Sequence, residues 1–156
     1  MNTRQRQVRT VGKYPFKKKI QVANTYAYLA PYIHGALCQF RKNEPLGFPA
    51  DVDTYEEWLA MLDEMIWAFN EIKREYPNSP EGNAIYKASH EHPDYYDYIT
   101  KEITKDGKIL HTMEFLHPEY HDEAVTPAVI KEEEAYRKRI QQGLMLFAKN
   151  FENLWD

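Results

Sequence analysis

The sequence predicts a mainly α-helical fold, with three principal helices around one core and a small β-hairpin at about residues 98–115. Three observations support this prediction. Apolar residues recur at helical spacing in three long stretches. An Asp-Gly pair at 106–107 separates two short runs that are rich in β-branched residues. The 156 residues, of which 43% are hydrophobic, suffice for one core without disulfides or a structural metal.

The first helix is predicted within residues 24–43, where apolar residues are spaced by four, four and three positions: Leu29, Ile33, Leu37 and Phe40. Proline fits a helix only near its start, so we expect the regular helix to begin at Ala30 or Pro31. Residues 44–49 contain two prolines around a glycine, which predicts a loop.

The second helix is predicted over residues 54–76. Thr54 and Glu57 form a capping box, in which each side chain binds a free backbone N–H at the helix start. One broad apolar stripe follows the helix and predicts a buried face: Tyr55, Trp58, Leu59, Leu62, Met65, Ile66, Phe69, Ile72 and Tyr76. Trp67 lies beside this stripe, so we expect a second surface to cover it.

The remaining chain is predicted to contain a short helix over 82–90, the hairpin, an acidic loop over 117–125, and a third principal helix from Thr126-Pro127. A lone hairpin is marginally stable, so we expect it to pack on the helices. Gly35 and Gly143 fall inside predicted helices, where glycine is unfavourable. Their presence predicts that two helices approach closely there.

Charge is distributed unevenly along the chain. Residues 1–43 contain nine Lys or Arg and no acid, whereas residues 44–156 contain the other eleven and all 24 acids, giving net charges of +9 and −13. We predict an N-terminal arm over 1–20 and a single helical domain over 21–156. The arm is predicted to contact the acidic body of the chain or of another copy, a partner protein, or nucleic acid. The candidate binding residues are Arg4, Arg6, Arg9, Lys13, Lys17, Lys18 and Lys19.

Three stretches of the chain resemble tailed-phage proteins of unknown function. They read Leu46-Gly47-Phe48-Pro49, then Asp53-Thr54-Tyr55-Glu56-Glu57-Trp58 and Leu62-Asp63-Glu64-Met65-Ile66-Trp67-Ala68-Phe69. The C-terminal run from Arg139 to Phe151 and the ending Asn153-Leu154-Trp155-Asp156 are similar to the C-termini of the same group. The resemblance covers about residues 29–76 and 126–156, and it implies a virus-encoded protein in the cytoplasm of a bacterial host. It implies no activity.

Histidines and tyrosines concentrate between residues 86 and 121. Tyrosine faces can stack on bases, form a protein-binding surface, or pack the hairpin onto the helices, and the candidate binding residues are Tyr95, Tyr96, Tyr98, His111 and Tyr120. Histidines interleaved with acids are also the ligand types that zinc takes, although no standard spacing is present. The candidate metal ligands are His90, His92, His117 and His121.

The sequence contains no Walker loop, no G-x-G-x-x-G, no C-x-x-C and no nucleophile motif. We therefore expect no cofactor and a non-enzymatic protein that acts by binding, as a homo-oligomer. The resemblance implies a phage accessory protein, so we expect it to bind a host protein or a host-derived small ligand, and interference with host defence is one hypothesis within this class. The alternatives are a nucleic-acid-binding or virion-associated protein that uses the arm, and a metal-dependent enzyme. The single Cys38 and the lack of a long apolar run predict a cytoplasmic protein without a membrane partner.

Overall fold

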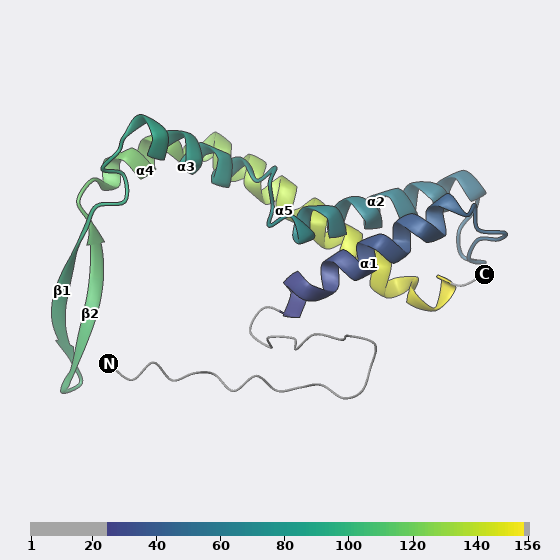
Figure 1. The fold of residues 1–156 in the computed structure, drawn as a ribbon, viewed down its shortest axis with the longest axis horizontal. Coiled ribbons are helices and arrows are strands. Elements are labelled where there is room, and N and C mark those ends of the chain that lie inside the picture. The colour runs from purple at the N-terminus through teal and green to yellow at the C-terminus, as the bar shows by residue number, and fades with distance from the viewer. Residues whose placement is uncertain (1–24, 155–156) are drawn as a thin grey trace. The chain divides into compact units, whose positions relative to one another are not determined.

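The computed structural model describes residues 25–154, which are mainly helical with one small antiparallel hairpin (Figure 1). The predicted fold class is confirmed. Contacts divide the chain into two compact units. The first contains the described residues up to Tyr76 and from Arg139 onward, and the second contains Pro77–Lys138. The single domain predicted over 21–156 stays a prediction, because one helix, α5 (Pro127–Lys149), contributes to both units.

The first unit contains two paired helices, the C-terminal part of α5 and a short 3-10 helix: α1 (Thr25–Lys42), α2 (Tyr55–Lys73) and η2 (Phe151–Asn153). Figure 1 shows α1 and α2 side by side. The predicted capping box is present at the start of α2. The Glu57 N–H donates to Thr54 Oγ1 at 3.1 Å, and the Glu57 carboxylate accepts from the Asp53 N–H at 3.3 Å.

The core of the first unit follows the predicted stripe of α2, whose buried members are Trp58, Leu62, Met65, Phe69 and Ile72. Leu37 of α1 and Ile140 of α5 are buried as well. Phe69 packs edge to face against Phe147 of α5, with 4.9 Å between the ring centroids. This arrangement suits the charge distribution of aromatic rings and adds to the hydrophobic gain.

Pro31 lies inside α1, which begins at Thr25, so the prediction that the helix starts at Ala30 or Pro31 was wrong. A proline in a helix lacks one N–H, and the carbonyl four residues earlier, that of Ala27, loses its usual donor. Pro31 is exposed, and Ala27 is only half-buried. The helix therefore continues through the proline at a position where water can reach the backbone.

The two glycines within helices differ in their surroundings. A β-carbon on Gly143 would lie 2.5 Å from Ala68 Cβ and 2.8 Å from the Glu64 carbonyl oxygen, so α5 approaches α2 closely here, as predicted. A β-carbon on Gly35 would have no atom within 4 Å. The predicted close approach at Gly35 was therefore wrong.

Trp67 is half-buried and lies under a side chain of α5. The guanidinium carbon of Arg139 is 3.9 Å from the centroid of the Trp67 ring. Arg139 also binds both carboxylate oxygens of Glu64, at 2.7 and 2.9 Å. The second surface predicted to cover Trp67 is therefore the Arg139 side chain, whose positive charge is attracted to the face of the ring.

The second unit contains the first part of α5 and two further helices, α3 (Pro80–Glu91) and α4 (Pro118–Ala124). Ser79 caps α3 by accepting from the Gly82 N–H at 3.0 Å, and it donates to the buried Glu133 carboxylate of α5 at 2.7 Å. Residues 118–124 were predicted to be loop. They form a helix because Pro118 occupies its first turn, where proline is well tolerated.

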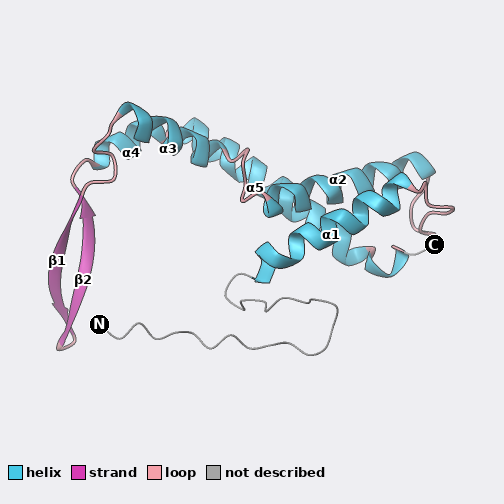
Figure 2. Ribbon diagram, in the orientation of Figure 1, coloured by secondary structure: helices cyan, strands magenta, loops and turns pink. Residues whose placement is uncertain are grey.

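The predicted hairpin consists of β1 (Tyr98–Lys105) and β2 (Lys108–Phe115), the two strands in Figure 2. Their pairing runs from Tyr98 opposite Phe115 to Lys105 opposite Lys108. Asp106 and Gly107 both have positive φ, at 53° and 73°, as a type I′ turn requires. Every residue of both strands is exposed. The prediction that the helices cover the hairpin was therefore wrong.

Candidate binding pocket

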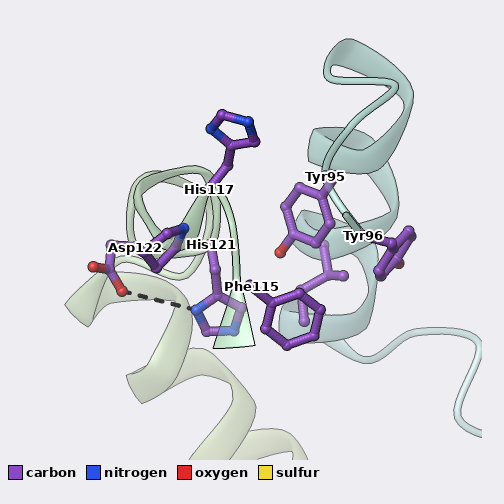
Figure 3. Close-up of a pocket in the computed structure, with 8 residues that line it drawn as sticks. Tyr95, Tyr96, Phe115, His117, His121 and Asp122 are labelled. Carbon is purple, nitrogen blue, oxygen red and sulfur yellow. Dashed lines mark ion pairs between the residues drawn. The ribbon is translucent and has the colours of Figure 1, made fainter. Parts of the chain in front are cut away.

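A pocket of about 380 Å³ lies within the second unit, where α3, α4 and the base of the hairpin meet (Figure 3). This volume is within the range of small-molecule sites. Eight residues line it: Ile85, Tyr95, Tyr96, Phe115, His117, Pro118, His121 and Asp122. The lining is therefore mostly apolar and aromatic, with a few polar atoms.

The loop between α3 and β1 positions the two tyrosines. Its turns are fixed by backbone hydrogen bonds from the Tyr95 N–H to the His92 carbonyl at 3.0 Å and from the Asp97 N–H to the Asp94 carbonyl at 2.9 Å. The Leu116 N–H donates to the Asp97 carbonyl at 2.9 Å, which ties the end of β2 to this loop. These bonds bring Phe115, at the end of β2, close to Tyr95 and Tyr96, which precede β1 in the sequence.

Tyr95 is the most deeply placed of the pocket's polar side chains. It is 6% exposed, and its hydroxyl has no hydrogen-bond partner. Figure 3 shows this hydroxyl on the side of the ring that faces His121 and Phe115. Burial, with a smaller contribution from Tyr96, raises the pKa of Tyr95, so the phenol keeps its proton. An unpaired buried hydroxyl is costly, and a bound polar atom would remove that cost.

The two histidines at the pocket point in different directions (Figure 3). His121 Nδ1 is 3.9 Å from Asp122 Oδ1. His117 faces two carboxylates, with Nε2 at 3.3 Å from Asp94 and Nδ1 at 3.0 Å from Glu119. A backbone hydrogen bond and then the His117 contact lower the pKa of Glu119. His117 is therefore held by two protein carboxylates, whereas His121 lies on the pocket side of α4 (Figure 3).

Tyr120 packs between two histidine rings on the other side of α4. It stacks on His92, with centroids 3.9 Å apart and planes 10° apart, and on His117, with centroids 4.9 Å apart and planes 20° apart. Burial and the neighbouring carboxylates, Asp94 first, raise the pKa of Tyr120. His92 and Tyr120 instead border a second, more polar hollow of about 360 Å³ with Glu91 and Glu123.

The predicted aromatic and histidine site is thus only partly assembled. Tyr95 and Tyr96 line the pocket, and Tyr120 packs behind it. Tyr98 and His111 belong to the hairpin, where they pair with Phe115 and Glu102, and they do not line the pocket. Four lining residues were not among the predicted site residues: Ile85, Phe115, Pro118 and Asp122. The one signal in the sequence for these residues was the aromatic Phe115 at the end of the predicted hairpin.

The predicted metal ligands serve other purposes in the described chain. His90 Nδ1 donates to the Tyr86 carbonyl at 2.8 Å, and His92 stacks on Tyr120. Within residues 25–154, no group of three or more His, Cys, Asp or Glu side chains is arranged to hold a metal ion. The metal-dependent enzyme therefore has no assembled site in this part of the chain.

The candidate residues of the basic arm, from Arg4 to Lys19, lie outside the described residues, so their binding role stays a prediction. Comparison with protein-family models, with curated proteins and with solved structures finds no match for this chain. Among the helices that the structure describes, none has the length and apolar character needed to cross a membrane.

Proposed function

We propose that this protein is a non-enzymatic binding protein whose pocket receives a neutral, planar aromatic ring that carries a hydrogen-bonding group. The observation that carries this proposal is the buried hydroxyl of Tyr95, which has no hydrogen-bond partner and lies on the side of the ring toward two lining residues, Phe115 and His121 (Figure 3). A ligand atom that accepts from this hydroxyl gains a hydrogen bond and removes the cost of an unsatisfied group. A fully apolar ligand would leave that cost in place.

The walls of the pocket support a flat and largely apolar ligand. Phe115 and Tyr96 offer ring surfaces, while Ile85 and Pro118 offer aliphatic contact. Aromatic rings pack well against such surfaces in stacked or edge-to-face geometry. The volume of about 380 Å³ is at the small end of ligand sites, which suits one or two fused rings with substituents.

The charges at the pocket favour a ligand without phosphate. The lining residues include no Lys or Arg, and Asp122 contributes a carboxylate at the edge. A phosphate requires cationic or N–H donors, and it would be repelled by this carboxylate. The ligand class is therefore a neutral aromatic ring, such as a nucleobase or the side chain of an aromatic amino acid.

The source of such a ring is a host-derived small molecule or an exposed aromatic residue of a host protein. The resemblance to tailed-phage proteins supports a role as a phage accessory protein in the cytoplasm of an infected bacterium. Sequestering a host ligand or docking on a host protein would interfere with host defence or metabolism. This biological role depends on the resemblance, whereas the ligand class depends on the pocket.

The ligand class is tested by isothermal titration calorimetry with the full chain. The probes are adenosine and uridine for the nucleobase source, N-acetyl-tryptophanamide for the amino-acid source, and adenosine monophosphate as the phosphate-bearing control. We expect at least one neutral probe to bind, and adenosine monophosphate to bind more weakly than adenosine. Absence of binding by all three neutral probes at millimolar concentration would overturn the proposal.

A pair of variants assigns the binding to Tyr95. Tyr95→Phe keeps the ring and removes the hydroxyl, so we expect affinity to fall by about fivefold to tenfold. Tyr86→Phe removes an exposed hydroxyl that does not line the pocket, and it should bind as the parent protein does. If the parent protein and Tyr95→Phe bound the probe with equal affinity, the probe would not contact the Tyr95 hydroxyl and would bind at another site.

A further inference from the structure

The hairpin exposes an unusual amount of apolar surface. All residues of β1 and β2 are exposed, and seven of them are large hydrophobics: Tyr98, Ile99, Ile103, Ile109, Leu110, Met113 and Phe115. A two-stranded sheet on its own is at best marginally stable in water. Its outer edges also present unpaired backbone groups, which pair readily with another strand. This surface therefore suits a strand from a partner.

The turn defines which backbone groups are free. In the type I′ turn, the Lys105 carbonyl accepts from the Lys108 N–H, so these two residues form a hydrogen-bonded pair. Hydrogen-bonded and non-hydrogen-bonded pairs alternate along an antiparallel ladder. The outward-facing N–H and C=O groups of β2 therefore belong to Ile109, His111, Met113 and Phe115.

We propose that β2 pairs with β2 of a second copy, antiparallel and around a two-fold axis at Thr112, to form a four-stranded sheet. This register places Ile109 opposite the partner's Phe115 and His111 opposite the partner's Met113. In this register the outward N–H and C=O groups of all four residues form hydrogen bonds between the copies. A register shifted by two residues would leave some of these groups unpaired. The proposal concerns the hairpin and does not depend on the pocket.

Side-chain chemistry supports this register. Residues directly opposite each other share one face of the sheet, so Ile109 and the partner's Phe115 form one apolar row with Tyr98 of that partner and Thr104 of the first copy. On the other face, Thr112 meets the partner's Thr112, which is a favourable cross-strand pair. This pairing thus places no like charges opposite each other.

The alternative edges are less suitable. Pairing β1 with the partner's β1 by the same rule centres on Lys101, so two lysines would lie directly opposite each other, which is destabilising. Pairing β1 with the partner's β2 is not symmetric and leaves a free β2 on one side and a free β1 on the other, so further copies would add through the same contact. A closed dimer therefore forms through β2.

Two proline variants distinguish the edges. His111→Pro removes an outward N–H of β2, and Glu102→Pro removes an outward N–H of β1 directly opposite it, so both perturb the hairpin to a similar extent. In sedimentation equilibrium of the full chain, we expect the parent and Glu102→Pro to be dimeric and His111→Pro to be monomeric. A monomeric parent at micromolar concentration, or loss of the dimer in Glu102→Pro alone, would overturn the proposal.

Charge variants at Thr112 test the position of the axis. Thr112→Glu and Thr112→Lys each place like charges opposite each other in the dimer, and we expect the dimerisation Kd of each to rise about tenfold or more. An equimolar mixture of the two places opposite charges there, so it should recover association as a heterodimer. Thr112 lies opposite Lys101 in its own hairpin, so Thr112→Lys also places two lysines opposite each other there, whereas Thr112→Glu does not. Circular dichroism of each variant checks that the fold is retained. Failure of the mixture to associate more tightly than either variant would exclude this register.

Discussion

Gly143 of α5 lies so close to Ala68 of α2 that a β-carbon on Gly143 would be 2.5 Å from Ala68 Cβ. The Glu64 carbonyl oxygen, which is backbone and cannot move easily, would be at 2.8 Å. Glycine is unfavourable in a helix by about 1 kcal/mol relative to alanine. Its presence here is explained by helix contact, which a larger residue would prevent.

Gly143→Ala should lower the free energy of unfolding by about 1–3 kcal/mol, because overpacking outweighs the gain in helix propensity. Gly35→Ala is the matched control, since a β-carbon there has no neighbour within 4 Å. It should raise the free energy of unfolding by about 0.5–1 kcal/mol. Urea unfolding measures both changes, and a stabilising Gly143→Ala would show that the helices are not in contact at this point.

Arg139→Lys should lower the free energy of unfolding by about 1 kcal/mol. Lysine keeps the charge but loses the planar group that binds Glu64 through two nitrogens and covers Trp67. Arg41→Lys is the control, because Arg41 also binds both oxygens of its partner, Asp63, at 3.0 and 3.4 Å. Chemical unfolding should show a smaller decrease in the free energy of unfolding for Arg41→Lys than for Arg139→Lys. Equal decreases would show that the contact with the Trp67 ring is not the cause.

Glu133 makes stability depend on pH. Burial opposes its ionisation, but hydrogen bonds from Ser79, Arg137 and the Glu81 N–H outweigh burial, so the pKa of Glu133 lies below its ordinary value. A lowered pKa contributes stability above the unfolded value of about 4.3, and this contribution is lost as the pH falls through the native pKa.

Glu133→Gln should therefore cost about 1–3 kcal/mol at neutral pH, and the cost should shrink as the pH falls below about 4. Glu132→Gln changes an exposed neighbour on α5 and should have little effect. Thermal unfolding across this pH range measures both variants. A difference between Glu133→Gln and the parent that does not change with pH would contradict the argument.

Tyr95→Phe should not destabilise the free protein, although it changes a buried residue. Its hydroxyl has no partner, so its removal should leave the free energy of unfolding unchanged or raise it by about 1 kcal/mol. Ser79→Ala is the contrasting case, because that buried hydroxyl accepts from Gly82 and donates to Glu133. It should cost about 1–3 kcal/mol in the same urea measurement. A comparable loss for Tyr95→Phe would indicate that its hydroxyl is bonded.

Features determined by near neighbours in the chain were predictable. Thr54 and Glu57 are three residues apart, so their cap can be read from the sequence, and Asp106-Gly107 likewise specifies its turn. Residues 117–125 were predicted to be a loop, but Pro118 lies in the first turn of α4, where proline is favourable. That error followed from taking a residue type without its position in the element.

The pocket was harder to predict because its walls come from separate elements. Ile85 lies on α3, Phe115 ends β2, and Asp122 lies on α4. Their meeting depends on backbone bonds such as that between Leu116 and Asp97, which leave no pattern in the residue types. The clustering of tyrosines in the sequence indicated the region of the pocket. That the Tyr95 hydroxyl has no hydrogen-bond partner could be recognised only in the structure.

The shared helix α5 has a consequence for dissecting this protein. The first compact unit is discontinuous in sequence, since it needs residues after Arg139 as well as those up to Tyr76. A gene fragment that stops after α2 would encode α1 and α2 without Phe147, the ring that packs on Phe69. Expressing the first unit by itself therefore requires a gene from which the codons of the second unit, Pro77–Lys138, are deleted. A linker would then join the segment that ends at Tyr76 directly to the segment that begins at Arg139.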